Sequence, residues 1–77
     1  MLYLSGLAVG ESGRVKCLRA AEGEGRRLMD LGFTPGARAK CLLAAPGGMR
    51  AYQVRGAVIA LRRKEARQVI LEEENHA

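Results

Sequence analysis

The sequence predicts a small all-β domain, a strongly bent barrel of about five short strands with one short helix. The 10 glycines of this 77-residue chain fall between short apolar runs, as tight turns fall between strands. Apolar and charged residues alternate along several of these runs, which is the pattern of half-buried strands. Only one segment has helical spacing. Closure into a barrel would remove the exposed edges of a flat five-stranded sheet.

The first expected strand follows a glycine-containing turn and begins near Arg14. Arg14 and Lys16 alternate with Val15 and Cys17. Because side chains of a strand point to opposite faces in turn, we expect Val15 and Cys17 to face the interior.

The one expected helix runs from about Glu22 to Leu31. Leu28 and Leu31 lie three residues apart on one face, and Met29 lies beside them. A helix this short is marginally stable alone, so it must dock on the sheet.

The end of this helix is well marked. Gly32 suits the left-handed position that follows a helix, and Phe33 then lies where a Schellman motif brings an apolar side chain against Leu28. Pro35 prevents continuation. We therefore expect a set of residues to hold the helix in place: Leu28, Leu31, Gly32, Phe33 and Pro35.

Two Pro-Gly turns, at residues 34–37 and 45–48, bracket the next strand. In each, Pro fixes φ near −65° and Gly follows where a type II turn needs a positive φ. Arg38 and Lys40 are expected to face solvent. The small apolar residues that alternate with them are expected inside: Ala37, Ala39, Cys41 and Leu43.

A hairpin about Gly56 follows, then one helical turn at residues 63–67 and a last strand at residues 68–72. The inward positions of the hairpin are expected to be Tyr52, Val54, Ala57, Ile59 and Leu61. The domain is expected to cover residues 1–72, and residues 73–77 to form a disordered acidic tail.

The sequence offers no convincing catalytic or metal site. The only histidine, His76, lies at the C-terminal end, and no two carboxylates have a spacing that would converge in a pocket. Cys17 and Cys41 would supply only half of a tetrahedral metal site, and buried free cysteines commonly pack as small apolar residues. We expect no enzyme, no metal and no cofactor.

The apolar stretch at residues 1–10 is too short to span a bilayer and lacks the basic flank of a signal peptide. We therefore expect a cytoplasmic protein with reduced cysteines.

The net charge of +5 raises the alternative of a nucleic-acid-binding module. The basic residues of this outer face are Arg14, Lys16, Arg38, Lys40, Arg50 and Arg55, with a cluster at residues 62–67. Single-strand binders stack bases on exposed aromatic rings, however, and two of the three aromatic residues are expected inside. RNA or ribosome binding is the alternative function, and an acidic protein or an anionic membrane surface would also suit a basic face.

The helix carries a second candidate surface. Met29 is expected to face away from the sheet beside Arg26 and Arg27, and Met and Arg are enriched at protein interfaces. The alternative is that Met29 covers the mouth of the barrel.

Three motifs, at residues 4–15, 26–36 and 56–62, give the chain a resemblance to a known family. The middle one, Arg-Arg-Leu-Met-Asp-Leu-Gly-Phe-Thr-Pro-Gly, is the most specific. With the flanking glycines in order, the chain resembles the FeoA domain of bacterial ferrous iron transport over residues 4–72. The resemblance implies an SH3-like barrel without catalytic activity, an accessory protein of the FeoB membrane transporter, which has a cytosolic G-protein domain.

The resemblance implies that the protein docks on the cytosolic part of that transporter and binds no nucleic acid. It would reach the membrane only through this partner. Weak self-association is left open. Family members often carry Asp-Pro after the loop glycine, where this chain has Met49-Arg50 after Gly48. The expected partner contacts are Arg26, Arg27, Met29, Gly48 and Met49.

Overall fold

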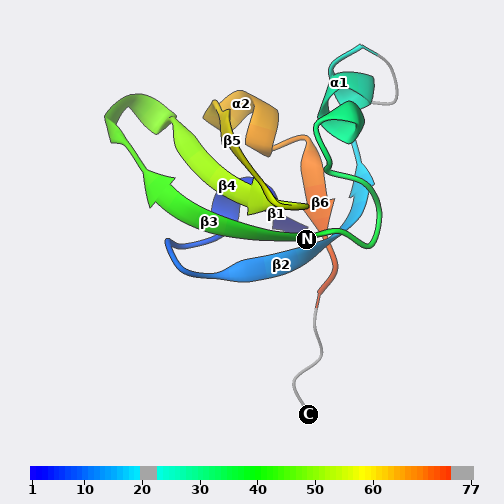
Figure 1. Ribbon diagram of the computed structural model, residues 1–77, viewed down its shortest axis with the longest axis horizontal. Helices are drawn as coiled ribbons and strands as arrows, with labels where there is room; N and C mark the ends of the chain where they lie inside the picture. The colour runs from blue at the N-terminus through cyan, green and yellow to red at the C-terminus, as the bar shows by residue number, and fades with distance from the viewer. Residues whose placement is uncertain (20–22, 74–77) are drawn as a thin grey trace.

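The computed structural model describes residues 1–19 and 23–73. These residues form ten short elements, and Figure 1 labels the helices and strands among them. In chain order they are β1 (Leu2–Tyr3), the 3₁₀ turn η1 (Leu4–Gly6), β2 (Ser12–Leu18), α1 (Glu24–Asp30), β3 (Arg38–Ala44), the 3₁₀ turn η2 (Pro46–Gly48), β4 (Arg50–Val54), β5 (Ala57–Leu61), α2 (Arg63–Ala66) and β6 (Val69–Leu71). The predicted helix start at Glu22, the tail beyond residue 73 and His76 lie outside the described residues.

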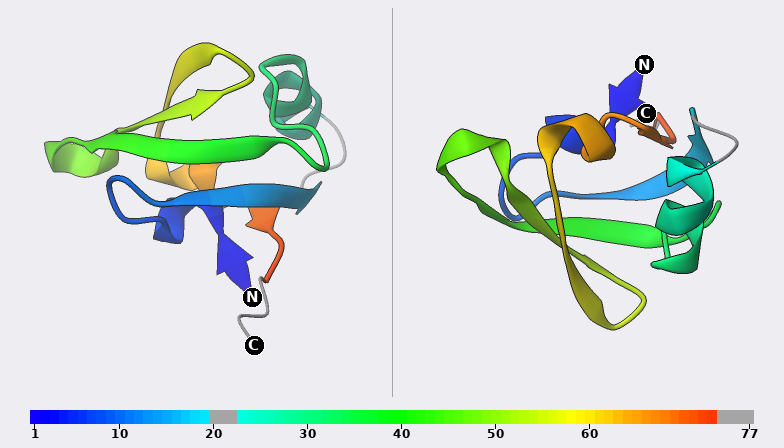
Figure 2. Two further views of the ribbon diagram at one scale, coloured as in Figure 1. Left: turned by 60° about the horizontal axis from the view of Figure 1, so that its bottom comes forward. Right: turned by 90° about the horizontal axis from the view of Figure 1, so that it is seen from above.

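All strands join one antiparallel sheet in the order β1-β6-β2-β3-β4-β5. Strand β2 belongs to both halves of this sheet: residues 12–14 pair with β3, and residues 15–18 pair with β6. In the left view of Figure 2, β3 lies on one side of β2, and β1 and β6 lie on the other. The predicted bent all-β architecture with one main helix is confirmed.

The sheet contains one strand more than the five expected. Strand β1 is only two residues long and pairs with β6, so it is too short to show an alternating pattern. Within the described residues the ladder ends at β1 and β5. The expected loss of all strand edges is therefore not met, because these two strands each pair on one side only.

The core is built around two aromatic rings. Phe33 and Tyr52 are fully buried and meet edge to face, with ring centroids 6.4 Å apart and planes at 86°. The Tyr52 hydroxyl donates a hydrogen bond to the Leu4 carbonyl oxygen at 3.3 Å. Further core residues come from η1, from strands β2, β4, β5 and β6, and from both helices: Leu4, Val15, Leu28, Val54, Leu61, Ala66, Val69 and Leu71.

Two inward predictions are wrong because of β-bulges. The register of β2 against β6 shifts between Val15 and Cys17, and Cys17 is exposed. The register of β3 against β4 shifts between Cys41 and Leu43, and Leu43 is 58% exposed. An extra residue in one strand reverses the alternation beyond it.

The remaining inward predictions are met, except near the β4–β5 turn. Val15, Ala39, Cys41 and Tyr52 are fully buried. Farther along the chain, Ala37 and Val54 are buried and so is Leu61, but Ile59 is only half-buried and Ala57 is exposed. Position 57 directly follows the turn, where little of the core reaches.

The predicted Schellman motif ends α1. The Phe33 N–H donates to the Leu28 carbonyl oxygen and the Gly32 N–H to the Met29 carbonyl oxygen, both at 3.0 Å. Gly32 has a φ of +118°. This end places Phe33 in the same buried core as Leu28, so the last turn of the helix is anchored to the core.

Both predicted Pro-Gly turns are present. In the first, Gly36 has a φ of +88° and the Ala37 N–H donates to the Thr34 carbonyl oxygen at 2.9 Å. In the second, Gly47 has the φ of 85° and ψ of 2° that a type II turn needs, within η2. The charged positions of β3 face solvent as predicted.

Replacing Gly32 with Ala is expected to lower the free energy of unfolding by about 1–2 kcal/mol through the left-handed φ, with a further loss from packing. A Cβ at Gly32 would lie 3.4 Å from Val54 Cγ1, whereas Gly36 has a similar φ and open space around it. Urea denaturation should therefore rank Gly32→Ala as more damaging than Gly36→Ala. Gly6→Ala, also in open space, is the control.

Burial raises the pKa of the Tyr52 phenol above its ordinary value of about 10, outweighing the nearby Arg50 guanidinium, which lowers it. A raised pKa in the folded state stabilises the fold at pH values below the ordinary pKa, and this contribution is lost as the pH rises through the folded pKa. The free energy of unfolding should be flat near neutrality and fall above about pH 10. The free energy of unfolding should fall less with pH in the Tyr52→Phe variant. An equal fall in both proteins would mean that other titrating groups cause it.

Candidate functional site

Three short elements border one side of the sheet, which we call the helical face: α1, α2 and η2. In Figure 1 and in the view from above in Figure 2, α2 lies between α1 and η2. A Cβ on Gly48 of η2 would lie 3.6 Å from Arg63 Cβ of α2. An ion pair joins α2 to α1. The helical face thus contains both segments that were predicted to contact a partner.

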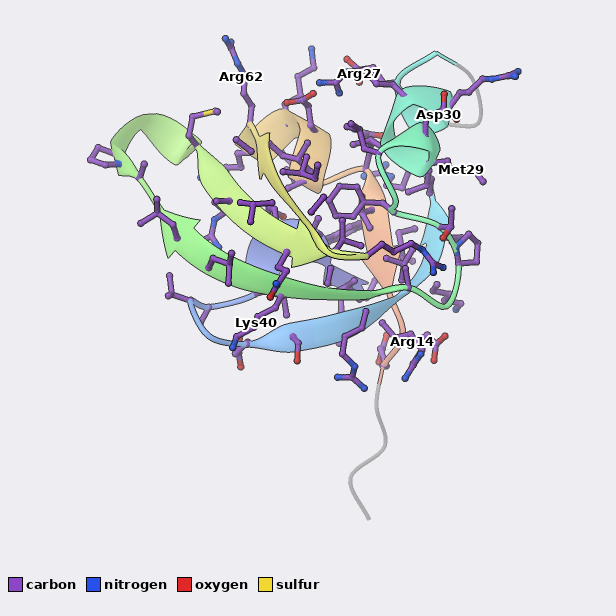
Figure 3. All side chains as sticks on the ribbon, viewed as in Figure 1. Arg14, Arg27, Met29, Asp30, Lys40 and Arg62 are labelled. Atoms are coloured by element: carbon purple, nitrogen blue, oxygen red, sulfur yellow. The ribbon has the colours of Figure 1, made fainter. Side chains whose placement is uncertain are left out.

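The α1 candidates project from a helix that is anchored by Leu28. Leu28 is fully buried, whereas Met29 is 44% exposed and Arg26 is exposed. Figure 3 shows Met29, Arg27 and Asp30 around the outside of this helix. An apolar side chain of this size, half in solvent and beside a cation, is typical of an interface position.

Arg27 has a contact within the fold. Its Nη1 atom donates to Glu65 Oε2 at 2.7 Å, and the Glu65 side chain is only 18% exposed. The other carboxylate oxygen of Glu65 accepts a hydrogen bond from the Arg62 N–H at 2.9 Å. One carboxylate therefore starts α2 and holds α1 against it.

Sequence reasoning missed this role of Glu65. In a capping box, a Glu three residues after the N-cap residue accepts a hydrogen bond from the N-cap N–H. The sequence has this spacing between Arg62 and Glu65. Nothing in the sequence alone indicates that the same carboxylate also binds Arg27, which is 38 residues away.

The η2 candidates lie at the other end of the helical face. Met49 is 39% exposed and Gly48 is half-buried. The five predicted contact residues therefore form two groups, one on α1 and one at η2, separated by α2.

Further exposed apolar residues accompany Met49 at this end of the sheet: Val9, Leu42 and Leu43. The loop that contains Val9 is bound to β3, because the Gly10 N–H donates to the Cys41 carbonyl oxygen at 2.7 Å. The bulge after Cys41 leaves both following leucines exposed. The sequence pattern placed Leu43 inside, so this group could not be found from alternation.

Several basic residues of the outer face bind the chain itself. Arg14 and Arg38 lie directly opposite each other on β2 and β3, an arrangement that repels. Their guanidinium groups donate elsewhere, to the Gly36 carbonyl oxygen at 2.8 Å and to Ser12 Oγ at 3.4 Å.

Arg50 and Arg55 are likewise engaged. Arg50 was predicted to face outward, but it is half-buried and donates to the Leu7 carbonyl oxygen and to Cys41 Sγ. Arg55 donates twice to Thr34 Oγ1.

The aromatic residues offer no base-stacking platform. Phe33 and Tyr52 are fully buried, as predicted. The third, Tyr3, is half-buried, and the Arg19 guanidinium lies 5.8 Å from its ring centroid. All three aromatic residues of the chain are thus committed to contacts within the fold.

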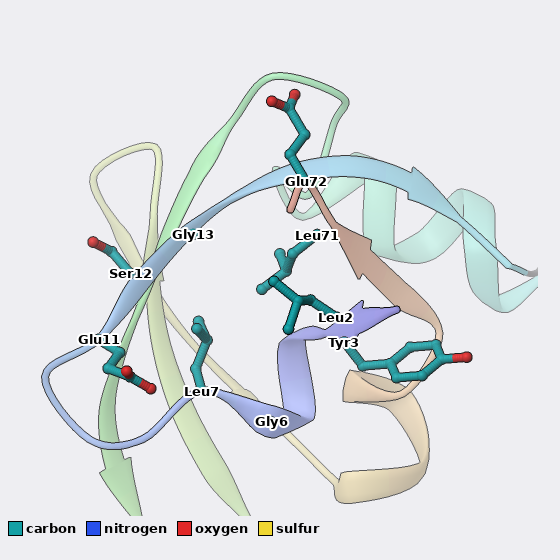
Figure 4. Close-up of a pocket in the computed structure, with 9 residues that line it drawn as sticks. All are labelled: Leu2, Tyr3, Gly6, Leu7, Glu11, Ser12, Gly13, Leu71 and Glu72. Carbon is teal, nitrogen blue, oxygen red and sulfur yellow. The ribbon is translucent and has the colours of Figure 1, made fainter. Parts of the chain in front are cut away.

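A hollow with a volume of about 280 Å³ lies on another part of the surface, between the N-terminal segment and the start of β2 (Figure 4). Leu2, Leu7 and Leu71 form its apolar wall, and Glu11 and Glu72 contribute carboxylates. It contains none of the predicted contact residues.

Within residues 1–19 and 23–73, no three His, Cys, Asp or Glu side chains come together as metal ligands would. Of the two thiols, Cys17 is exposed and Cys41 is buried. In the same described ranges, no helix has the length and apolar character needed to cross a bilayer.

The FeoA domain family matches residues 2–73 of this chain. The solution structure of FeoA from Chlorobium tepidum is 34% identical in sequence with a TM-score of 0.84, and the match covers 97% of this chain and 76% of that one. None of the curated proteins matches the chain significantly in sequence.

FeoA from Stenotrophomonas maltophilia, solved with zinc, is 30% identical with a TM-score of 0.84 over 94% of this chain and 91% of that one. It is described as a prokaryotic SH3 domain protein and as a candidate activating factor of bacterial ferrous iron transport. A manganese-dependent transcriptional repressor shares the fold at 19% identity and a TM-score of 0.80, over 94% of this chain and 41% of that one. The predicted SH3-like barrel and the predicted family are confirmed.

A double-mutant cycle on Arg27→Gln and Glu65→Gln is expected to give a coupling of about 0.3–1 kcal/mol in the free energy of unfolding, smaller at high salt. Gln at position 65 keeps an acceptor for the Arg62 N–H, so the cycle isolates the ion pair. The same cycle with Arg26→Gln should show no coupling. Equal coupling for both arginines would mean that Glu65 interacts with the overall positive charge of α1 and not with Arg27 in particular.

Proposed function

The chain belongs to the FeoA family. From this premise we propose that it is a cytoplasmic accessory protein and not an enzyme. It docks on the cytosolic part of a FeoB-type ferrous iron transporter and modulates the transporter's activity. The described relative from Stenotrophomonas maltophilia supports a role in activating ferrous iron transport. Residues 1–72 are proposed as the docking domain, with residues 73–77 as a tail.

One observation carries the proposal: Met29 is 44% exposed on a helix that is otherwise firmly anchored. Leu28 holds α1 from below, and the pair between Arg27 and Glu65 holds it from the side. A preorganised apolar anchor loses little conformational entropy on binding, so its buried area contributes efficiently to affinity. Arg26, exposed on the same helix, would lie at the rim of the contact.

The group at η2 is proposed as a second contact. Met49 is exposed there, and Gly48 brings the loop against α2 without a side chain in between. Because α2 separates η2 from α1, a partner that touches both groups must cover the whole helical face.

The proposed mechanism is a shift in population. The domain would bind one state of the transporter better than another, and the difference in affinity would set how far the equilibrium moves. This mechanism requires a rigid surface and no chemical step.

RNA binding by the basic outer face has less support. Arg14, Arg38 and Arg50 donate to groups of the chain itself, and no aromatic ring is free to stack on a base. If RNA binding were the function, the affinity would fall steeply with salt in proportion to the phosphates contacted.

Met29→Asp is expected to weaken binding to the cytosolic part of the transporter by about 100-fold, because a charge would be buried at the centre of the contact. The melting temperature should change little, since the side chain is half in solvent. Titration calorimetry at low and high salt, with purified partner domain, measures the effect.

Leu2→Asp is the matched control. Leu2 is 49% exposed and lies on β1, which the left view of Figure 2 shows on the opposite side of β2 from α1 and η2, so the same change of charge there should leave binding intact. Normal binding by Met29→Asp, or equal loss in both variants, would contradict the helix-anchored contact.

A further inference from the structure

Strand β5 has an open edge. It is last in the sheet order and pairs only with β4, and Figure 2 shows the β4–β5 hairpin at the periphery of the fold. Val58 is 63% exposed, and Ala57 and Ala60 are exposed as well. A peptide approaching from outside would therefore meet this edge directly.

The hairpin turn fixes which backbone groups face outward. Arg55 and Gly56 have φ values of +47° and +78°, the positive pair of a type I′ turn. In a two-residue hairpin the flanking residues, Val54 and Ala57, exchange ladder hydrogen bonds, and so do alternate pairs beyond them. Val58 and Ala60 are therefore the non-hydrogen-bonded positions, and their N–H and C=O groups point away from β4.

These outward groups have no partner in the part of the chain that is described. No backbone or side-chain hydrogen bond from another element reaches Val58 or Ala60. The next outward donor, the Arg62 N–H, is taken by Glu65 Oε1. The free edge is thus short and well defined, with two donors and two acceptors between the turn and α2.

The strand lacks the usual protection of an exposed edge. Its sequence, Ala-Val-Ile-Ala-Leu, has no Pro, no charged residue and no bulge against β4. Unprotected apolar edges are templates for the addition of another strand.

Cations flank this edge on the α2 side. Arg62, Arg63 and Lys64 follow directly after Leu61 and are exposed, and Figure 3 shows Arg62 projecting into solvent. The only carboxylate of α2, that of Glu65, is occupied by Arg27. The positive charge beside Leu61 is therefore not neutralised locally.

We propose that β5 binds an extended peptide segment that adds as an antiparallel strand, with acidic residues at its N-terminal end. Antiparallel addition places the N-terminal end of the peptide beside Leu61, and hence beside the cations of α2. This is a binding site separate from Met29 and does not depend on the proposed contact with the transporter.

A second copy of this chain suits the edge less well. Antiparallel pairing of β5 with itself would bring Arg62 and Arg63 of each copy towards Arg55 of the other. Like charges close together across a strand pair are destabilising. Charge complementarity therefore favours an acidic segment.

The test uses the isotope-labelled full chain and a synthetic peptide, acetyl-Glu-Asp-Thr-Val-Thr-Val-Thr-amide. Binding should give cross-strand NOEs to the Val58 and Ala60 amides and slow their hydrogen exchange. A peptide with Lys in place of both acids should bind about tenfold more weakly at low salt. NOEs to another element, or equal binding of both peptides, would overturn the proposal.

Ala60→Pro provides the variant arm. Its N–H is not used in the ladder with β4, so Pro at this position spares the fold while blocking the edge. We expect binding at least about tenfold weaker than for Ala60→Val, which keeps the N–H. Thermal unfolding checks both variants, and Val58→Pro replaces Ala60→Pro if the latter is unfolded.

Unchanged peptide binding by the folded Pro variant would refute the edge site. Sedimentation analysis of the protein alone identifies a competing occupant: a dimer that Ala60→Pro dissociates would assign the edge to a second copy and overturn the acidic-segment proposal. The transporter is absent from every arm, so failure here leaves the proposed function untouched.

Discussion

The edge-to-face contact between Phe33 and Tyr52 joins three parts of the chain that are remote in sequence. Phe33 follows α1, Tyr52 lies on β4, and the Tyr52 hydroxyl reaches the Leu4 carbonyl oxygen near the N-terminus. A domain of this size buries only a modest share of its surface. It therefore relies on these two large rings to fill the core and to hold the end of α1, strand β4 and the N-terminal segment together.

The same contact determines what remains outside. Phe33 and Leu28 are both fully buried and are joined by a backbone hydrogen bond, which holds α1 with Met29 on its exposed side. The helix is held again at its side by Glu65. The backbone that carries Met29 is thus held in place by contacts within the fold, so a partner meets a helix that does not need to be ordered first.

Local chemistry made much of this fold predictable. The Schellman end at Gly32, both Pro-Gly turns and the alternation around Tyr52 depend on residues close in sequence, and the structure contains them all. The bulges after Val15 and Cys41 were not predictable, because an extra residue is set by pairing with a distant strand. For the same reason the sequence revealed neither strand β1, the partner of Arg27, nor the open edge of β5.

The position of β6 has a consequence for how the protein is made. This strand is the last element among the described residues, yet it lies between β1 and β2, the first two strands in chain order. During synthesis the N-terminal strands must wait for residues 69–71 before their half of the sheet can assemble. Contacts of such high sequence separation slow folding. The half of the sheet that holds β1 and β6 can therefore form only after residues 69–71 have been synthesised, whereas β2 to β5 are neighbours both in the chain and in the sheet and can pair earlier.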